Sequence, residues 1–529
     1  MNTNSGTNLT KSNLLGTNKL FGLDINYPVF LISSGLAILF SSLVLIFPES
    51  SSVFLSSSRN FVVSRFDTLF TVSMSVFTLI IFFLILSPAG RIKLGGEDSS
   101  PEFSFLSWIC MLFSAGVGIG MTFYGAAEPL SYYTGIFGTP LNVNPVTEEA
   151  QRLAFSATIF HWGINGWSVY AIIGLSLAFF CYNRNLPLTV RSIFYPLLGD
   201  KIWGWQGDLI DVIAVLATLF GLATSLGLGA QQAASGLLYL FDIPNTLLSQ
   251  TLIIIFITAV AIFSVFRGLD KGVKLLSNIN IGLAAILLLF VILAGPTYQI
   301  LTSYGENLAH YFQDIFRLSS WNRIEDQDWY RDWTIFYWAW WISWSPFVGM
   351  FIARISKGRT IREFLTAAMF VPLMFSLIWF SSFGQTAIFQ FQEGIGELSK
   401  PVGDISLVLF YMLDNLIFPV LTSLFALFIL VLFFVTSSDS GSLVINTITS
   451  GGKENTPRIQ RVIWATIQGL IAIVLLVGGG SYALSAIQAG AISMALPFSF
   501  ILIAATISLL RGIYIEINFS EKKETANER

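Results

Sequence analysis

The chain has 529 residues, of which 54% are hydrophobic and only 11% are charged, and its formal net charge is -3. A water-facing fold cannot hide that much apolar surface, so the composition excludes a soluble globular protein and predicts one that crosses a membrane several times. The small net charge and the short, scattered basic clusters give no indication of nucleic-acid binding. Cys110 and Cys181 lie within or at the end of apolar runs, which argues against a disulfide framework or a metal cluster.

Apolar runs of about 18 residues or more mark the predicted membrane-spanning helices. They lie near residues 28–47, 67–87, 105–133, 152–180, 209–238, 249–266, 275–297, 330–356, 365–391, 415–437, 460–478 and 485–510. Twelve spans place both termini on one side of the membrane. The polar stretch 1–27 lacks the pattern of a signal peptide, so we interpret it as a retained tail.

Basic residues are unevenly distributed among the predicted loops. The loops on the side of the termini carry about twice as many Lys and Arg residues as the opposite loops, and the positive-inside rule therefore places both termini in the cytoplasm. The longest opposite loop, near 298–330, is acidic. It contains an amphipathic segment at 304–316 that is expected to lie along the outer surface.

The span at 105–133 carries the motif Gly116-Val117-Gly118-Ile119-Gly120. Alternating glycines remove side chains where backbone could approach a ligand, and glycine also permits unwinding. The amides of Gly116, Val117 and Gly118 could then bind a substrate carboxylate at the end of a half helix. Close packing of helices explains this motif alone equally well.

The span at 152–180 adds Trp162, Trp167 and Tyr170, which fall within about 140° of arc on a helix. Together with Trp341 on a later span they could form a cage for a quaternary ammonium group. Packing of a large helical core is the alternative interpretation.

Two of the ionisable residues within the predicted spans, His161 and Glu128, could have a functional role. His161 could relay protons, since ionisable groups inside membranes are often functional, but a neutral histidine bonded to a neighbouring helix is the favoured interpretation. Glu128, in Glu128-Pro129, lies near the end of a span, where a cap or a structural salt bridge is favoured over catalysis.

An aromatic stretch at 333–347 contains five of the 14 Trp residues of the chain. Trp333, Tyr337, Trp341 and Trp344 fall within about 80° of arc, and a ring stripe running three turns into a span is better placed to line a cavity than to face lipid. The stripe alone favours core packing. Ser345-Pro346 favours a site, because proline should kink or open the helix and free carbonyls at membrane depth.

A run of hydroxyls, from Thr436 and Ser437 to Ser442, comes at the end of the span at 415–437. Hydroxyls and the carbonyls of an unwound helix suit a hard monovalent cation such as sodium. Hydroxyls that bond back to the i-4 carbonyl are the equally good alternative. The sequence shows no nucleophile and base pair, P-loop or metal-ligand cluster, so an enzyme is not expected.

The spans at 105–133 and 330–356 are both expected to be interrupted, and each opens a block of five spans. Paired breaks of this kind indicate a secondary transporter with an inverted repeat and a site near the midplane. The predicted fold is an all-α polytopic membrane protein with two extra helices before a five-plus-five core. Its parts are a cytoplasmic tail (1–27), two peripheral helices and a loop (28–104), the first repeat (105–297), an outer loop (298–329), the second repeat (330–510) and a short cytoplasmic tail (511–529).

The segments 161–170, 333–356 and 436–442 closely resemble the betaine/carnitine/choline transporter family, and the resemblance covers most of 101–450. It implies a sodium-symporter-like fold of twelve helices, assembly as a homotrimer in the cell membrane, and import of trimethylammonium compounds.

Carried over by position, the resemblance implies a set of site residues. The cage residues would be Trp162, Trp167, Tyr170 and Trp341, with Trp340 and Trp344 along the adjoining path and Ser225 touching substrate. Thr436, Ser437 and the carbonyls of Val117 and Phe433 would hold sodium, and Thr218 and Phe347 would form part of a second sodium site.

Two positions refine what the resemblance implies. Leu222 replaces a threonine found in some sodium-coupled relatives, which counts against the second sodium site. Gly120 replaces the aspartate typical of choline importers and favours a zwitterion. The expected function is sodium-coupled import of glycine betaine or a close analogue, with sodium as coupling ion and no other cofactor. The alternatives are a proton-coupled choline importer or a substrate:product exchanger of the same family and, from another class, a ligand-gated channel or membrane sensor.

Overall fold

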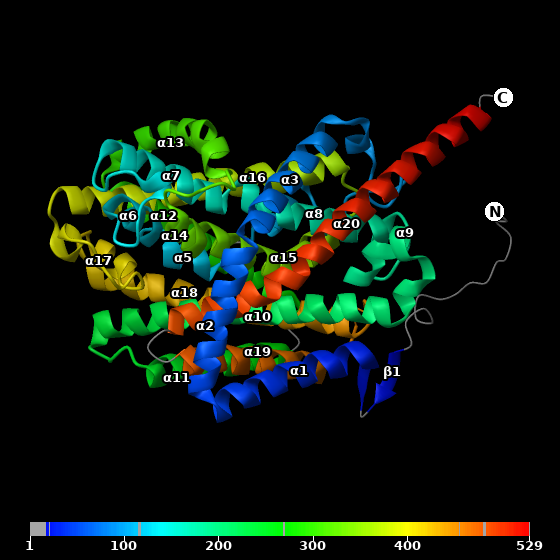
Figure 1. Cartoon of the computed structure of the whole chain (residues 1–529), viewed down its shortest axis with the longest axis horizontal. Helices are drawn as coiled ribbons and strands as arrows, with labels where there is room; N and C mark the ends of the chain where they lie inside the picture. The colour runs from blue at the N-terminus through cyan, green and yellow to red at the C-terminus, as the bar shows by residue number, and fades with distance from the viewer. Residues whose placement is uncertain are drawn as a thin grey trace.

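The computed structural model describes residues 17–20, 22–114, 118–267, 270–453, 455–479 and 483–527. These residues are almost entirely helical (Figure 1). Their long helices are α1 (Tyr27–Ile46), α2 (Pro48–Arg65), α3 (Asp67–Leu86), α7 (Glu148–Trp162), α8 (Ile164–Tyr182), α10 (Trp205–Phe241), α11 (Leu247–Arg267), α12 (Asp270–Ala294), α13 (Thr297–Leu318), α15 (Phe336–Arg354), α16 (Ile361–Gln392), α18 (Pro419–Thr449), α19 (Arg458–Gly479) and α20 (Ala483–Asn527).

Nine helical segments of this described part are long and apolar enough to cross a membrane, or ten if the bent pair α12 and α13 forms one span. The sequence predicts twelve. The two further predicted spans are atypical, because 105–133 is divided into short helices and α15 is rich in Trp, Tyr and Ser, which lower its hydropathy. The predicted all-α membrane class is confirmed.

The sheet within the described residues is a hairpin of β1 (Thr17–Leu20) and β2 (Leu23–Asn26), which pair antiparallel. It lies in the stretch expected to be a plain tail. The Asp24 carboxylate accepts from Nζ of Lys453 at 2.8 Å, and the Asp24 amide donates to the Gln460 side chain at 2.7 Å. The hairpin is therefore attached to the connection between α18 and α19.

The helices α1, α2 and α3 form a peripheral group, and α2 packs along α20 (Figure 1). The sequence predicts a loop at 48–66, because the many Ser and charged residues of this segment show no apolar periodicity. Many residues of α2 are exposed. The helix is stabilised by packing one side against α20.

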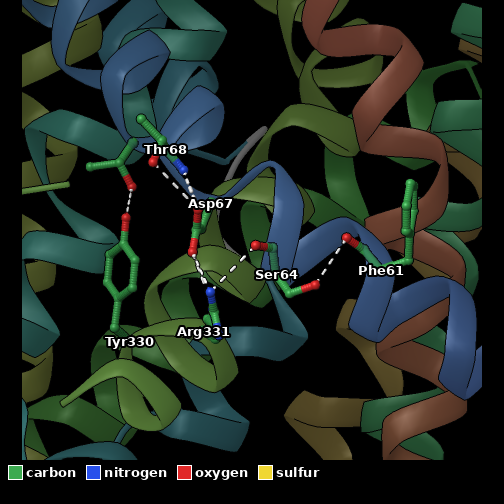
Figure 2. A network of polar contacts seen from close by, with 7 residues as sticks. Phe61, Ser64, Asp67, Thr68, Tyr330 and Arg331 are labelled. Atoms are coloured by element: carbon green, nitrogen blue, oxygen red, sulfur yellow. Dashed lines mark hydrogen bonds and ion pairs between the residues drawn. The ribbon is translucent and has the colours of Figure 1, made fainter. Parts of the chain in front are cut away.

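This peripheral group holds the segment that leads into α15, a π-helical turn at Tyr330–Ile335 (Figure 2). Arg331 donates to the Asp67 carboxylate at 3.0 and 3.1 Å and to the Ser64 carbonyl at 3.3 Å. The hydroxyls of Tyr330 and Thr71 also hydrogen bond to each other. The approach to α15 is therefore tied to α2 and α3.

The described part of the predicted span at 105–133 comprises α4 (Phe105–Ser114), α5 (Ile119–Tyr124) and α6 (Ala127–Thr134). Of the predicted interruption, the described residues show the non-helical backbone of Gly118 before α5. Gly116 and Val117 lie outside the described residues. A further break, not predicted, separates α7 from α8 at Gly163, where the freed Trp162 carbonyl accepts from the Ser376 hydroxyl at 3.0 Å.

The sequence predicts that Pro346 kinks or opens its helix, and the structure contradicts an opening. α15 continues through Pro346, and the Ile342 carbonyl that proline leaves without its backbone donor accepts from the Ser345 hydroxyl at 2.7 Å. The irregularity lies earlier, in the π-helical turn. A side chain adjacent to the proline therefore supplies a local partner for this carbonyl.

The amphipathic outer segment is a helix, α13, which makes a 112° bend with the end of α12. Phe316 is 84% exposed on one face, whereas Tyr311 and Asp314 are buried on the other. The helix lies across α7 and α16, as its two faces require. Figure 1 shows α13 along one edge of the bundle.

Two later helices run beyond their predicted ends. α18 continues to Thr449 rather than ending near 437, so the hydroxyl run lies inside a helix. α20 continues to Asn527, so the segment expected to be a tail after 510 is helical. β1 and the end of α20 lie on the same side of the molecule in Figure 1.

Candidate functional site

A small cavity lies where α5, α8 and α15 meet the end of α7. Its volume is about 20 Å³, which is room for about one water molecule. It is lined by Gly118, Ile119, Gly120, Trp162, Tyr170, Trp340, Trp341 and Trp344. None of the aromatic lining residues exposes more than 7% of its surface. The predicted aromatic residues thus surround a cavity that the protein shields from solvent.

The structure brings all four predicted cage residues together around Trp341. The Trp341 ring centroid lies 5.0 Å from that of Tyr170, 5.5 Å from Trp162 and 6.2 Å from Trp167. Trp167 does not line the cavity and packs behind Tyr170 and Trp341. Three of the four predicted cage rings therefore line the cavity. The fourth, Trp167, packs against two of them, Tyr170 and Trp341.

These rings approach one another because α8 and α15 cross closely. A methyl group at Gly349 of α15 would lie 2.1 Å from Cγ2 of Ile173 on α8. One at Gly166 of α8 would lie 2.8 Å from Cε2 of Trp341. Small residues at the crossing let two backbones approach, which is common where helices pack in membranes.

Gly120 places the backbone of α5 directly against two rings of the lining. A methyl group at this position would lie 2.6 Å from Cη2 of Trp162 and 2.7 Å from Cη2 of Trp340. Real Cβ atoms do not approach this closely, so any side chain would have to displace at least one ring. The conformation of the cavity depends on the absence of a side chain at Gly120.

Three indole N–H groups at the cavity differ in their partners. Trp344 donates to the Gly221 carbonyl on α10 at 2.8 Å, which fixes its ring. Trp340 and Trp341 have buried N–H groups without a hydrogen-bond partner in the described part of the chain. A buried donor without a partner is costly, about 1–3 kcal/mol, so a ligand that accepts from it would be favoured.

The aromatic stripe of α15 does not line the cavity along its whole length. Trp333 and Tyr337 pack on Tyr124, with centroids 6.0 and 5.6 Å away, and lie outside the lining. Trp333 belongs to the π-helical turn, where the angular spacing of an ideal α-helix does not hold.

Ser225, Thr218 and Phe347 lie near the site but not on its lining. The hydroxyls of Ser225 and Thr218 bond back to carbonyls of α10, at 3.4 and 2.8 Å. The Phe347 ring packs on Trp344 with centroids 5.5 Å apart. Leu222, on the same helix as Thr218, packs against Gly441 of α18.

The predicted sodium-site residues lie beside the break before α5. The Ser437 hydroxyl lies 3.7 Å from the position of a methyl group at Gly118. The Thr436 hydroxyl donates to the carbonyls of Leu432 and Phe433, at 2.9 and 3.1 Å. This is the bond to the i-4 carbonyl that the sequence offered as the alternative to a sodium site. The Thr436 oxygen still keeps lone pairs that could bind a cation.

Glu128, for which a cap or a structural salt bridge was the favoured interpretation, is fully buried on α6 and contacts His161. Its carboxylate accepts from Tyr132 at 3.0 Å, His161 Nδ1 at 2.9 Å, Trp162 Nε1 at 2.8 Å and Tyr337 at 2.5 Å. The signal in the sequence was an ionisable residue within an apolar span, which in membranes is a functional hypothesis by default.

His161 is bonded on both ring nitrogens. Nδ1 faces Glu128, and Nε2 lies 3.0 Å from the Thr334 hydroxyl on the π-helical turn. His161 is thus bonded to neighbouring helices, as the favoured interpretation predicts. Its carboxylate partner, Glu128, was not predicted. The described residues contain no group of three or more His, Cys, Asp or Glu that could hold a metal ion.

The apolar helices and the aromatic cavity that they enclose define a multi-pass membrane protein with an internal site for a small molecule. The comparison with known proteins names the class: the family model described as BCCT, betaine/carnitine/choline family transporter, matches residues 28–517. The chain belongs to this family. It is a transporter and not an enzyme.

Curated relatives match over nearly the whole chain. It is 50% identical to glycine betaine transporter 1 of Vibrio parahaemolyticus, covering 94% of this chain and 95% of the relative. It is 47% identical to a glycine betaine/proline/choline/ectoine transporter of the same organism, over 94% and 89%. It is 43% identical to glycine betaine transporter OpuD of Bacillus subtilis, over 90% and 92%.

Proposed function

We propose that the protein imports glycine betaine, or a close trimethylammonium zwitterion, together with sodium by alternating access. The observation that carries the proposal is the small cavity whose lining includes the rings of Trp162, Tyr170 and Trp341. A quaternary ammonium group has no hydrogen-bond donor, so aromatic faces are its best partners, at about 0.5–2 kcal/mol each. The relatives named as glycine betaine transporters support this choice of substrate.

The zwitterion also needs partners for its carboxylate. The indole N–H groups of Trp340 and Trp341 supply two buried donors, and the backbone around Gly118 supplies amides at the start of α5. Gly120 leaves no room for an acidic side chain beside the rings. The site therefore suits a molecule that carries its own negative group better than it suits choline.

Sodium would bind beside this cavity, between the hydroxyls of Thr436 and Ser437 and the carbonyls near the helix break. Oxygen ligands of this kind suit a hard cation. The position next to Gly118 favours coupling, because one short backbone segment would contact both the ion and the substrate. Thr218 and Phe347 remain proposed as part of a second sodium site.

The five-plus-five organisation is part of the same proposal. α4 to α12 supply five predicted spans and α15 to α20 supply five more, and each block begins with an irregular segment, the break before α5 or the π-helical turn. Irregular helices at matching positions are typical of inverted repeats around a midplane site. We propose assembly as a homotrimer in the cell membrane, with both termini in the cytoplasm.

Uptake of labelled glycine betaine into proteoliposomes tests the proposal. An inward sodium gradient should drive accumulation, and an equal potassium or proton gradient should not. Accumulation with protons instead would overturn the sodium coupling and leave the cage in place. Exchange against preloaded substrate without net accumulation would indicate an exchanger, and absence of betaine movement in all conditions would overturn the substrate.

A further inference from the structure

The Glu128 carboxylate lies behind the cage, on the side of Trp162 away from the cavity, and it connects three structural elements. It belongs to α6 and accepts from His161 and Trp162 at the end of α7 and from Tyr337 of α15. Four groups that can donate surround its two oxygens, an arrangement that suits an ionised carboxylate.

No lysine or arginine in the described residues forms an ion pair with this carboxylate, and the imidazole of His161 is the partner that could carry a positive charge. The other nitrogen of His161 faces the Thr334 hydroxyl. A neutral imidazole that donates from Nδ1 and accepts at Nε2 satisfies both contacts. In that tautomer, a negative charge on Glu128 has no lysine or arginine in direct contact with it among the described residues.

The indole of Trp162 connects this charge to the cavity. Its N–H donates to Glu128 Oε2 at 2.8 Å, while its Cη2 edge faces Gly120 in the cavity lining. A hydrogen bond from an indole N–H to a carboxylate increases the electron density of the ring, and ring attraction for a cation grows with that density. The same ring therefore contacts the charge at one end and the ligand at the other.

We propose that Glu128 is a positioning and specificity-determining residue for the cationic head group, an inference that rests on the proposed function. It holds the rings of Trp162 and Tyr337 in place, and through the Trp162 indole it adds negative potential that favours a trimethylammonium head over a neutral head of the same shape. The residue acts through the rings and does not touch the ligand itself.

Two ligands separate this role from a purely structural one. Glycine betaine and 3,3-dimethylbutanoate have the same shape and carboxylate, but the second has a neutral tert-butyl head. Their affinities for the purified full-length protein are measured by displacement of labelled glycine betaine in sodium. Glu128→Gln should weaken betaine at least tenfold more than the neutral isostere. Equal losses for both ligands, or no loss, would overturn the proposal.

A second variant tests the path through the indole. Trp162→Phe keeps a ring but removes the N–H, so it should lower the preference for betaine by itself, and adding Glu128→Gln should change that preference less than threefold further. If Glu128→Gln lowers the preference for betaine as much in the Trp162→Phe protein as in the wild type, the indole does not transmit the charge. That result would overturn the proposal. If Glu128→Gln does not fold, Trp162→Phe alone still tests it, since an unchanged preference contradicts it.

Asp314→Asn is the matched control, because Asp314 is a buried carboxylate of α13 that binds Arg152 and Ser156 far from the cage lining. It should lower thermal stability without changing the preference between the two ligands. A change in preference equal to that of Glu128→Gln would contradict the proposal. If wild-type protein binds neither ligand, the proposed function fails; if it binds betaine and Glu128→Gln keeps the preference, only the present inference fails.

Discussion

At the scale of single residues, the ring of Trp341 has the most contacts within the cage. It lies against Trp162, Trp167 and Tyr170, and its own N–H has no protein partner among the described residues. Trp338, three residues earlier, is equally buried but packs on Phe160 away from the cavity. Substitutions of Trp341 and Trp338 can therefore distinguish a role in ligand binding from a role in core packing.

Trp341→Leu should raise the KM for glycine betaine uptake about tenfold, because one aromatic face is worth about 0.5–2 kcal/mol to a quaternary ammonium group. Trp338→Leu should lower the unfolding temperature and change KM less than about twofold, since it removes packing only. Initial uptake rates over a range of betaine concentrations measure both. Equal increases in KM would contradict the assignment of the cage.

Gly120→Ala should also raise the KM, by about tenfold, because the added methyl group has to displace Trp162 or Trp340. Gly305→Ala on α13 is the control, since a methyl group there meets no atom within 4 Å. It should leave the KM unchanged. The same uptake assay measures both variants, and a Gly120→Ala protein with wild-type kinetics would show that the rings are not held as described.

The residues of the cage could be predicted from the sequence, whereas the network behind them could not. Trp162, Tyr170 and Trp341 are recognisable because ring residues recur at helical spacing on two spans. Glu128 was assigned a structural role because three of its four partners come from elements distant in the sequence, and periodicity within one element says nothing about such contacts. The position of Trp167 behind the lining also depends on how α8 and α15 are packed.

At the scale of helices, proline and hydroxyl residues behaved differently from the simplest expectation. Pro346 does not open α15, because Ser345 supplies the donor that proline lacks. Thr436 and Ser437 lie inside α18, which continues for three more turns. The break at Gly163 and the helix α2 have no strong signal in the sequence, since one lies inside a continuous apolar run and the other is polar.

The hydroxyl pair of α18 gives a prediction for sodium. Thr436→Ala and Ser437→Ala should each raise the sodium concentration for half-maximal betaine uptake on the order of tenfold, comparable to the loss of one contact to a charged group. Thr447→Ala is the control, because its hydroxyl makes the same back-bond, to Leu443 at 2.9 Å, further along the same helix. Sodium titrations of uptake would contradict the site if all three variants behaved alike.

At the scale of the whole molecule, the membrane class and most helices followed from apolar runs of sufficient length. The count of spans was harder, because the two segments nearest the cavity are atypical: one is broken into short helices and the other contains Trp, Tyr and Ser where ordinary spans contain aliphatic residues. Segments that build a binding site depart most from the average membrane helix.

The orientation in the membrane gives a prediction of its own. In a protein with Cys110 and Cys181 replaced by Ser, Phe316→Cys on the exposed face of α13 should react in intact cells with a maleimide that cannot cross membranes. Arg91→Cys should react only after the cells are opened, because the excess of basic residues places its loop in the cytoplasm. The reverse pattern would overturn the orientation.

The central claim is that the aromatic cavity holds the methylated head of the substrate. An electron cryomicroscopy map of the protein with glycine betaine and sodium tests it most directly. We predict density for the trimethylammonium group between the rings of Trp162, Tyr170 and Trp341, with the carboxylate toward the indole N–H groups and the start of α5. An empty cavity with betaine density elsewhere would contradict the account.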